Sequence, residues 1–149
     1  MLRRLYSLFV EYNENMVKKL RPFDIERFFL ALGDRTRLRL LNLMGDREIC
    51  VCYFVQILEQ SQPKISRHLA YLRKAGIVTA RREGKWMHYR IAMPANVGAA
   101  TVLQQTLAWL QNEKPMQEDR ARLAQACCSP SQFVELKRAP TPSVIAVEG

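Results

Sequence analysis

Apolar residues recur every three or four positions along most of the chain, a pattern that predicts a succession of amphipathic helices. The first is expected over residues 2–20, ending before Pro22, with an apolar face made of Leu2, Leu5, Phe9, Tyr12, Met16 and Leu20. We interpret this face as packing against the core or against a second subunit, and a role at a membrane surface is the alternative.

Two short helices are expected next, because each has an aspartate at its start and a glycine at its end. Asp24 and Gly33 bound the first, whose apolar face consists of Ile25, Phe28, Phe29 and Leu32. Asp34 and Gly45 bound the second, which has the sequence RTRLRLLNLM. A third helix is expected from the apolar stripe Val51, Phe54, Val55 and Leu58, and the polar turn EQSQ follows it.

A fourth helix and a β-hairpin are predicted after the EQSQ turn. Pro63 suits the first turn of a helix and Gly76 suits its end, so the run PKISRHLAYLRKAG is expected to be helical. Its inward face would carry Ile65, Leu69 and Leu72, and its outer face Lys64, Arg67, Tyr71 and Lys74. Beyond it, IVTARR and KWMHYRIA, joined by EG, show the alternation of two paired strands. We interpret Trp86 and His88 in this hairpin as packing residues rather than as a platform for stacked bases.

The C-terminal part of the chain predicts two further helices. The run NVGAATVLQQTLAWLQNEK follows Pro94 and carries two apolar rows, Leu103, Leu107 and Leu110 beside Val102 and Trp109. So much apolar surface on one helix suggests a subunit interface. A shorter helix is expected from Glu118 to Cys127. Pro130, Pro140 and Pro142 interrupt any pattern after it, and the last dozen residues are expected to be unstructured.

Positive charge is concentrated in one segment of the chain. The 149 residues contain 23 Lys and Arg against 14 Asp and Glu, a formal net charge of +9 that favours a polyanionic partner. The segment 61–90 holds one acid, Glu83, and eight basic residues: Lys64, Arg67, Arg73, Lys74, Arg81, Arg82, Lys85 and Arg90. The predicted fourth helix and hairpin therefore carry most of the positive field.

No membrane partner is expected. The N-terminus begins like a signal peptide, but Ser7 interrupts its apolar run and Glu11 ends it, so no secretion signal is predicted. No stretch approaches the roughly 20 apolar residues that cross a bilayer. A cytoplasmic location follows as an expectation, and there the four cysteines at 50, 52, 127 and 128 would be reduced thiols.

Two short helices with a polar turn, followed by a basic hairpin, form the order of a winged helix-turn-helix, which binds double-stranded DNA. The expected fold is mainly α with a small β-hairpin, divided into a dimerisation extension (1–22), a DNA-binding domain with a dimerisation helix (23–112) and a C-terminal helix with a flexible tail (113–149). Expected to reach bases or nearby phosphates are Gln62, Ser66, Arg67 and His68. Expected on the outer DNA-facing surface or at phosphates are Lys64, Tyr71, Lys74, Arg81, Arg82 and Lys85.

The run QSQPKISRHLAYLRKAGIVTARREGKWMHYRI resembles the helix-turn-helix and wing of the ArsR/SmtB family of metal-responsive repressors, in particular its arsenical-resistance repressors. Together with FFLALGDRTRLRLLNLM and EICVCYFVQIL, the resemblance covers about residues 25–92. It implies a homodimer that occupies an operator when metal-free and leaves it when an inducer binds.

Two cysteines one residue apart, Cys50 and Cys52, stand at the start of the predicted third helix. Within a helix, residues two apart point about 200° away from each other, so both sulfurs can grip one ion only where the first turn is frayed. Thiolates select soft ions, and a chelate of two or three sulfurs suits trivalent arsenic or antimony. No organic cofactor is expected.

The family's arsenical repressors carry the motif Glu-Leu-Cys-Val-Cys-Asp-Leu-Cys, whose first two cysteines match Cys50 and Cys52. The third falls on Val55 here, and Tyr53 replaces the acid. The site then consists of the first two thiols alone, of these with Cys127 or Cys128, or is accompanied by a separate site at the latter two. We favour the second arrangement, in which a mobile tail brings in the third sulfur.

Three other functions remain open from the sequence. A cadmium, lead or zinc sensor of the same family would use cysteines from residues 1–49 or His and acidic residues from 95–112, and neither range contains them. A thiol redox sensor is a further alternative, because vicinal thiols oxidise readily. A purely architectural DNA-binding protein is the third alternative, and in it the cysteines would have no function. An enzyme is not expected, since there is neither a Cys-x-x-Cys nor a nucleophile paired with a base.

Overall fold

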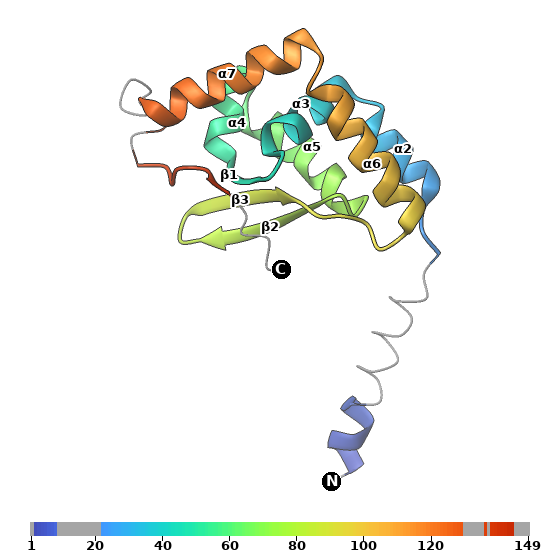
Figure 1. Ribbon diagram of the computed structural model, residues 1–149. Coiled ribbons are helices and arrows are strands. Elements are labelled where there is room, and N and C mark those ends of the chain that lie inside the picture. The colour runs from blue at the N-terminus through green and yellow to red at the C-terminus, as the bar shows by residue number, and fades with distance from the viewer. Residues whose placement is uncertain (1, 9–21, 130–135, 137, 145–149) are drawn as a thin grey trace.

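The computed structural model describes residues 2–8, 22–129, 136 and 138–144. Helices lie above a small antiparallel sheet (Figure 1). The helices are α2 (Ile25–Leu32), α3 (Arg35–Met44), α4 (Val51–Leu58), α5 (Gln62–Lys74), α6 (Val97–Leu110) and α7 (Lys114–Cys128). The strands are β1 (Arg47–Cys50), β2 (Val78–Glu83), β3 (Trp86–Ile91) and β4 (Ser143–Val144). The order α4, α5, β2 and β3 confirms the predicted winged helix-turn-helix.

Side-chain caps fix where the early helices begin. The Asp24 carboxylate accepts a hydrogen bond from the Arg27 backbone N–H at 2.9 Å, and Asp34 does the same for Arg37 at 2.9 Å. Each bond satisfies one of the backbone donors that a helix start leaves unpaired. Gly45 then ends α3 at a φ of 50°, a backbone conformation that glycine adopts without strain. Both helices begin and end as the sequence predicts.

The sheet has the strand order β2-β3-β1-β4. The hairpin of β2 and β3 is as predicted, with Gly84 in its turn at a φ of 58°. The strand β1 was not predicted, and it pairs antiparallel with β3 so that Cys50 lies opposite His88. Because β3 is covered on both edges, His88 and Tyr89 are both buried, in agreement with the prediction that His88 packs.

The hydrophobic core lies between α3, α4, α5 and the sheet. The largest side chains in it with no exposed surface include Leu40, Tyr53, Phe54, Ile65 and Leu69. The three inward positions predicted for α5, Ile65, Leu69 and Leu72, are therefore all buried. Burial of these side chains holds α5 against α3 and α4, and the outer face of α5 remains exposed to solvent.

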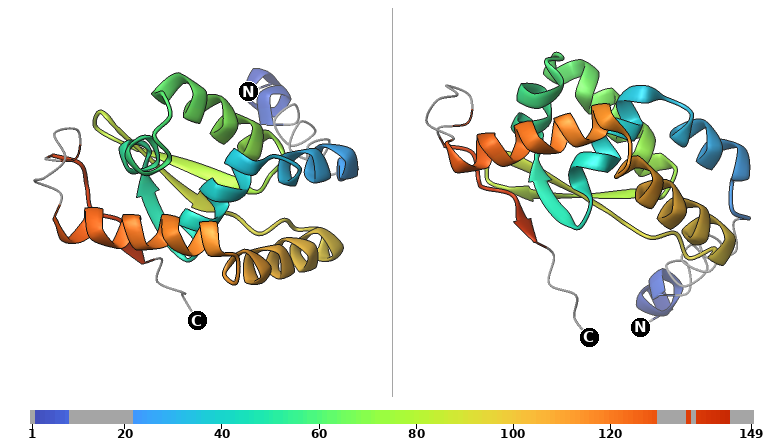
Figure 2. Two further views of the ribbon diagram at one scale, coloured as in Figure 1. Left: turned by 90° about the horizontal axis from the view of Figure 1, so that it is seen from above. Right: turned by 45° about the horizontal axis from the view of Figure 1, so that its top comes forward.

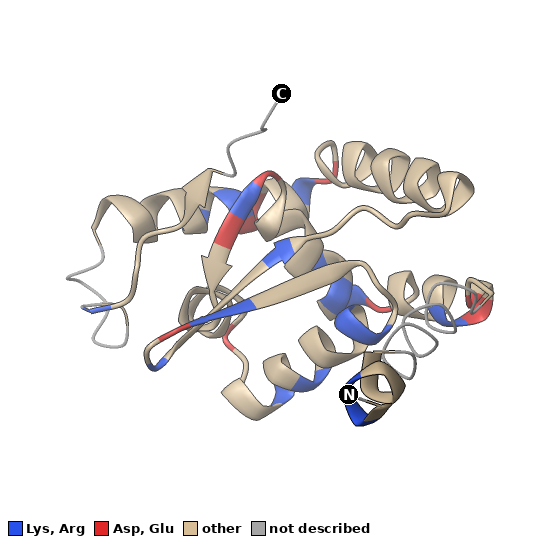
Figure 3. Ribbon diagram, turned by 90° about the horizontal axis from the view of Figure 1, so that it is seen from below, with Lys and Arg blue, Asp and Glu red and all other residues tan. Residues whose placement is uncertain are grey.

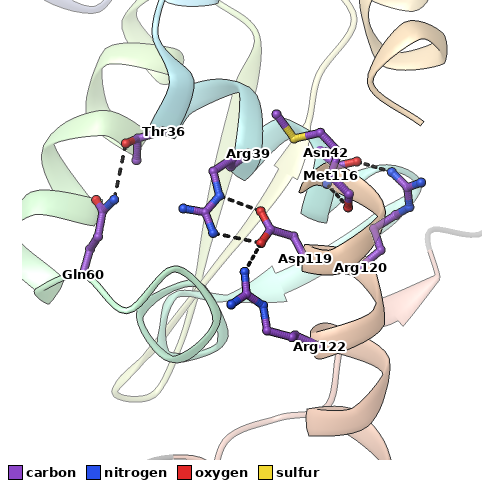
Figure 4. Close-up of polar contacts among 8 residues, drawn as sticks. All are labelled: Thr36, Arg39, Asn42, Gln60, Met116, Asp119, Arg120 and Arg122. Carbon is purple, nitrogen blue, oxygen red and sulfur yellow. Dashed lines mark hydrogen bonds and ion pairs between the residues drawn. The ribbon is translucent and has the colours of Figure 1, made fainter. Parts of the chain in front are cut away.

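Helix α7 is longer than predicted and is tied to α3 by buried polar groups. It begins at Lys114 rather than Glu118, because Pro115 occupies its first turn, where a missing N–H costs nothing. Asp119 accepts hydrogen bonds from Arg39 at 2.6 and 2.8 Å, and the Asn42 side chain donates to the Met116 carbonyl at 3.0 Å (Figure 4). Helix α7 runs along the side of the molecule away from α5 (Figure 2).

The described parts of the two chain ends agree only partly with the sequence predictions. Residues 2–8 are helical, as expected, whereas the rest of the helix predicted over 2–20 lies outside the described residues. At the other end Leu136 is 1% exposed, and β4 pairs with β1, so that Arg47 lies opposite Val144. This strand corrects the prediction that the whole of the last dozen residues is unstructured, because backbone pairing orders part of it. None of the described helices is long and apolar enough to cross a membrane.

Candidate functional site

The outer face of α5 presents polar and basic side chains to solvent. A left-handed residue, Glu59 at a φ of 53°, ends α4 and turns the chain sharply, and Pro63 then stands in the first turn of α5. Exposed on this helix are Gln62, Lys64, Arg67 and Lys74, and Ser66 is partly exposed. The geometry is that of a helix whose N-terminal half can enter the major groove, so we call α5 the recognition helix.

The hairpin β2–β3, called the wing below, adds a second group of exposed cations. Figure 3 shows lysine and arginine along both α5 and the hairpin. Arg82 and Lys85 are exposed, and the Lys85 ammonium lies 4.9 Å from the centre of the Trp86 ring. Arg81 instead contacts Glu48 at 2.5 Å and Glu83 at 3.4 Å. A phosphate that engages Arg81 must therefore compete with two carboxylates.

Two residues predicted to contact DNA, His68 and Tyr71, are partly buried and also contact α3. His68 Nδ1 is 3.5 Å from Asp34 Oδ1 and 3.5 Å from Arg37 Nη1, and the Arg37 guanidinium lies 4.3 Å from the centre of the Tyr71 ring. Burial lowers the pKa of His68, against the opposing charge of Asp34. His68 and Tyr71 thus position the recognition helix on α3, and neither presents its full side chain outward.

Arg37 was not singled out from the sequence. It donates hydrogen bonds to the Ala31 carbonyl at 2.8 Å and to the Leu30 carbonyl at 2.6 Å, at the end of α2. One side chain therefore connects α2, α3 and the recognition helix. An arginine three residues after a helix-capping aspartate carries no sequence signal for this role, because its partners are backbone carbonyls and an aromatic face.

Cys50 and Cys52, called the thiol pair below, lie where β1 meets α4. Cys50 is the last residue of β1 and has extended backbone angles of −67° and 142°, whereas Cys52 is in the first turn of the helix. Because only one of them is helical, both side chains turn to the same side. The Cys52 thiol donates to Cys50 Sγ at 2.9 Å. The two sulfurs are thus close enough to chelate one atom, as expected for a pair at a helix start.

The two thiols of the pair differ in pKa. The hydrogen bond from Cys52 lowers the pKa of Cys50 to about 7, outweighing the opposing effect of burial. The same hydrogen bond, together with burial, raises the pKa of Cys52. Cys50 therefore supplies a thiolate near neutral pH, and Cys52 keeps its proton until a ligand displaces it.

The other two cysteines lie in the last turn of α7 and not in a mobile tail. Cys127 packs against the core, and burial raises its pKa, whereas Cys128 is exposed. The helix α7 packs on α4, so Cys127 is on the element next to the thiol pair. Within the described residues, no three His, Cys, Asp or Glu side chains are already arranged to hold a metal ion. Binding of one ion by the thiol pair and a third sulfur would therefore require a movement of side chains or of α7.

Comparisons with known proteins agree with this geometry. The family model for bacterial regulatory proteins of the arsR family matches residues 34–80. The arsenical resistance operon repressor of Escherichia coli (strain K12) is 40% identical over 104 residues, which cover 69% of this chain and 87% of that protein. The chain belongs to the arsR family. Membership confirms the resemblance found from the sequence, and this family consists of DNA-binding regulators rather than enzymes.

Further relatives within the arsR family are named for resistance to different elements. The arsenic resistance transcriptional regulator ArsR1 of Pseudomonas putida is 53% identical over 64 residues, which cover 42% of this chain and 50% of that protein. A cadmium resistance transcriptional regulatory protein CadC homolog of Staphylococcus aureus is 36% identical over 74 residues, which cover 49% of this chain and 61% of that protein. The choice of inducer therefore depends on the residues of this chain.

Proposed function

We propose that this arsR-family regulator represses transcription as a homodimer on operator DNA and is released when trivalent arsenic, or antimony, binds the thiol pair. The observation that carries the proposal is the 2.9 Å separation of the two sulfurs at the junction of β1 and α4. Two thiolates at this spacing match a small thiophilic ion better than they match a hard cation.

The basic surface supports double-stranded DNA as the partner. Arg67 and Gln62 project from the recognition helix, and Arg82 and Lys85 project from the wing. Cations in these two places can hold phosphates on either side of a groove that the recognition helix enters. Release of counterions from those phosphates makes the affinity fall steeply as salt rises.

A homodimer is supported by apolar surface that a single chain leaves open. Phe29 of α2 and Trp109 of α6 are exposed and line one groove of about 550 Å³. Val97 and Leu30 add exposed apolar area on the same two helices. A patch of this kind is typical of a subunit interface. The helix predicted for residues 2–20 would add to this interface, and most of it lies outside the described residues.

The position of the thiol pair supports a mechanical route from inducer to DNA. Each sulfur that binds arsenic replaces a hydroxide, which leaves as water. Cys52 supplies the proton from its thiol, and solvent supplies it where Cys50 is already a thiolate. The bonds draw Cys50 and Cys52 toward one atom and distort the first turn of α4. Because α4 packs directly on the recognition helix, that distortion changes the angle at which α5 meets DNA.

The ion specificity is tested by fluorescence anisotropy with a labelled duplex that the protein selects from a random pool. The preformed complex is titrated with arsenite, antimonite, cadmium and zinc. We expect release by arsenite and antimonite at lower concentrations than by cadmium or zinc. Release by cadmium or zinc without release by arsenite contradicts the arsenic assignment and favours the family's alternative sensor type.

The ligand number is tested with single serine variants at positions 127 and 128. We propose that Cys127 supplies a third sulfur, because it is packed beside the core next to α4, whereas Cys128 is exposed. Cys127→Ser should raise the arsenite concentration for half-release, and Cys128→Ser is the matched control on the same turn. A double variant with unchanged sensitivity would remove both cysteines from the site.

A thiol redox sensor is the second candidate, favoured by the contact of the two sulfurs and by the lowered pKa of Cys50, which is about 7. An oxidant of the hydroperoxide class would convert Cys50 to a sulfenic acid, and Cys52 would then displace water to form a disulfide. Release of DNA by hydrogen peroxide, reversed by dithiothreitol and absent in Cys52→Ser, supports this function. Release by arsenite under full reduction is the result that separates the two.

A further inference from the structure

Tyr53 is a fully buried tyrosine whose hydroxyl lacks a hydrogen-bond partner within the part of the chain that the structure describes. It lies in the first turn of α4, directly after the thiol pair, with an exposed fraction of 0%. Its hydroxyl has no hydrogen-bond partner among the described residues. Buried tyrosine hydroxyls usually find a partner, because an unpaired one costs free energy. A phenylalanine would fill the same space without that cost, so the hydroxyl calls for a reason other than packing.

Tyr53 lies in the part of the core where the thiol-bearing ends of α4 and α7 pack together. Burial, with a smaller contribution from the charges of neighbouring thiols, raises the pKa of Tyr53 to about 12, so the hydroxyl keeps its proton. Tyr53 directly follows Cys52 in α4, and it belongs to the core cluster against which Cys127 of α7 packs. The helices α4 and α7 are in contact, and Leu123 and Ala126 of α7 are buried beside Cys127. Tyr53 therefore lies on the helix that carries Cys52 and that packs on the helix of Cys127.

We propose that the Tyr53 hydroxyl donates a hydrogen bond to the sulfur of Cys127 once that sulfur binds the inducer. The inference deepens the proposed function and rests on it. When Cys127 binds arsenic, its thiol proton leaves with a hydroxide of arsenic as water, and the sulfur keeps partial negative charge in a buried place. A hydrogen-bond donor stabilises such a sulfur, and Tyr53 offers one that is otherwise unused.

The proposal predicts effects of opposite sign in the unloaded and loaded states. In the unloaded protein the hydroxyl is unpaired, so Tyr53→Phe should raise Tm, by about 2–5 °C for a chain of this size. In the loaded protein the hydroxyl is paired, so the same change should weaken arsenite binding about tenfold. A residue that only fills space would change both states in the same direction.

The experiment measures Tm without arsenite and the arsenite concentration for half-release of DNA, in the full chain. Tyr53→Phe is compared with Tyr89→Phe, which removes another buried tyrosine hydroxyl from β3. We expect a higher Tm and an approximately tenfold higher half-release concentration for Tyr53→Phe, and an unchanged half-release concentration for Tyr89→Phe. A half-release concentration within twofold of wild type in Tyr53→Phe overturns the proposal.

A double variant shows whether Tyr53 acts through Cys127. In a Cys127→Ser background, Tyr53→Phe should no longer change the half-release concentration, because the sulfur that receives the hydrogen bond is gone. The same tenfold effect in both backgrounds contradicts the proposed partner. A different result would contradict the proposed function itself. In that case arsenite does not release DNA from the wild type at any concentration at which the thiol pair would bind arsenite.

Discussion

Asp119 carries a charge in an almost fully buried position, with 1% of its side chain exposed. The Arg39 guanidinium holds both of its oxygens, and Arg122 donates to one of them (Figure 4). This ion pair is the main polar connection between α3, which supports the recognition helix, and α7, which carries Cys127. The geometry is bidentate, which is the arrangement that offsets the cost of burying a carboxylate.

Replacing Asp119 with alanine should destabilise the protein substantially. The change leaves Arg39 partly buried without its partner, and we expect a loss of about 2–4 kcal/mol in the free energy of unfolding. Urea denaturation followed by circular dichroism measures this loss. Glu118→Ala, at the exposed neighbouring position, is the matched control and should change stability by less than about 0.5 kcal/mol. Equal effects of the two variants would contradict a structural role for the ion pair.

The same pair predicts a dependence of stability on pH. Burial alone would raise the pKa of Asp119, but the hydrogen bonds from Arg39 and Arg122 outweigh it and lower the pKa below the ordinary value of 3.8. The stabilisation is thus fully present above pH 3.8 and is lost as the pH falls below it. Urea midpoints from pH 6 to pH 3 should fall more steeply for wild type than for Asp119→Asn. Parallel curves would show that the carboxylate is not stabilised by its partners.

The thiol pair was predictable because its spacing and its place before an apolar stripe are visible in the sequence, and the structure places both sulfurs together. The surroundings of Tyr53 were not predictable, because Cys127 is 74 positions away in the chain and was expected in a tail. The packing of α7 on α4 decides that neighbourhood. Likewise the contacts of His68 and Tyr71 with Arg37 of α3 could not be read from the sequence, because they depend on how α5 packs on α3.

We propose that the recognition helix and the wing both contribute to DNA affinity, and a salt series can separate their contributions. Arg82 is exposed and makes no described ion pair, whereas Arg81 is held by Glu48 and Glu83. The free energy that Arg82 contributes to binding should therefore come mainly from phosphate. Arg67, on the recognition helix, can contribute both phosphate and base contacts.

Arg82→Ala should weaken DNA binding several-fold for every sequence and lower the slope of log affinity against log salt by about one. Anisotropy titrations at a series of salt concentrations measure the slope. Lys114→Ala, which removes an exposed cation from α7, is the matched control and should leave both quantities unchanged. An unchanged slope in Arg82→Ala would remove the wing from the interface.

Helix boundaries followed from the sequence wherever a cap or a glycine marks them, as at Asp24, Asp34 and Gly45. The strand β1 could not be found in this way. Its four residues, REIC, form a strand because β3 and β4 pair with it, and those partners lie far along the chain. The start of α7 was placed four residues late because Pro115 was not taken as a first-turn residue.

The arrangement of the whole molecule leaves one apolar face without a partner within the described residues. Trp109 is 69% exposed and Phe29 is 53% exposed, and they lie on opposite sides of one groove between α2 and α6. A two-fold symmetric contact through this face would join two recognition helices in one dimer, and a palindromic operator has two half-sites for them.

Phe29→Glu should therefore convert a dimer into a monomer without unfolding the chain, because the side chain is exposed in the monomer. Light scattering after size exclusion measures the mass, and the variant should also lose most of its DNA affinity. Gln125→Glu adds the same charge at an exposed position of α7 and should remain dimeric. A dimeric Phe29→Glu would place the subunit interface elsewhere.

The central claim is that arsenic at Cys50 and Cys52 releases DNA. Its most direct test is the anisotropy of a labelled protein–DNA complex under reducing conditions, titrated with arsenite for wild type and for the variant with both Cys50→Ser and Cys52→Ser. We predict that both proteins bind the duplex equally in the absence of arsenite and that arsenite releases only the wild type. Release of the double variant at the same arsenite concentration would contradict the account.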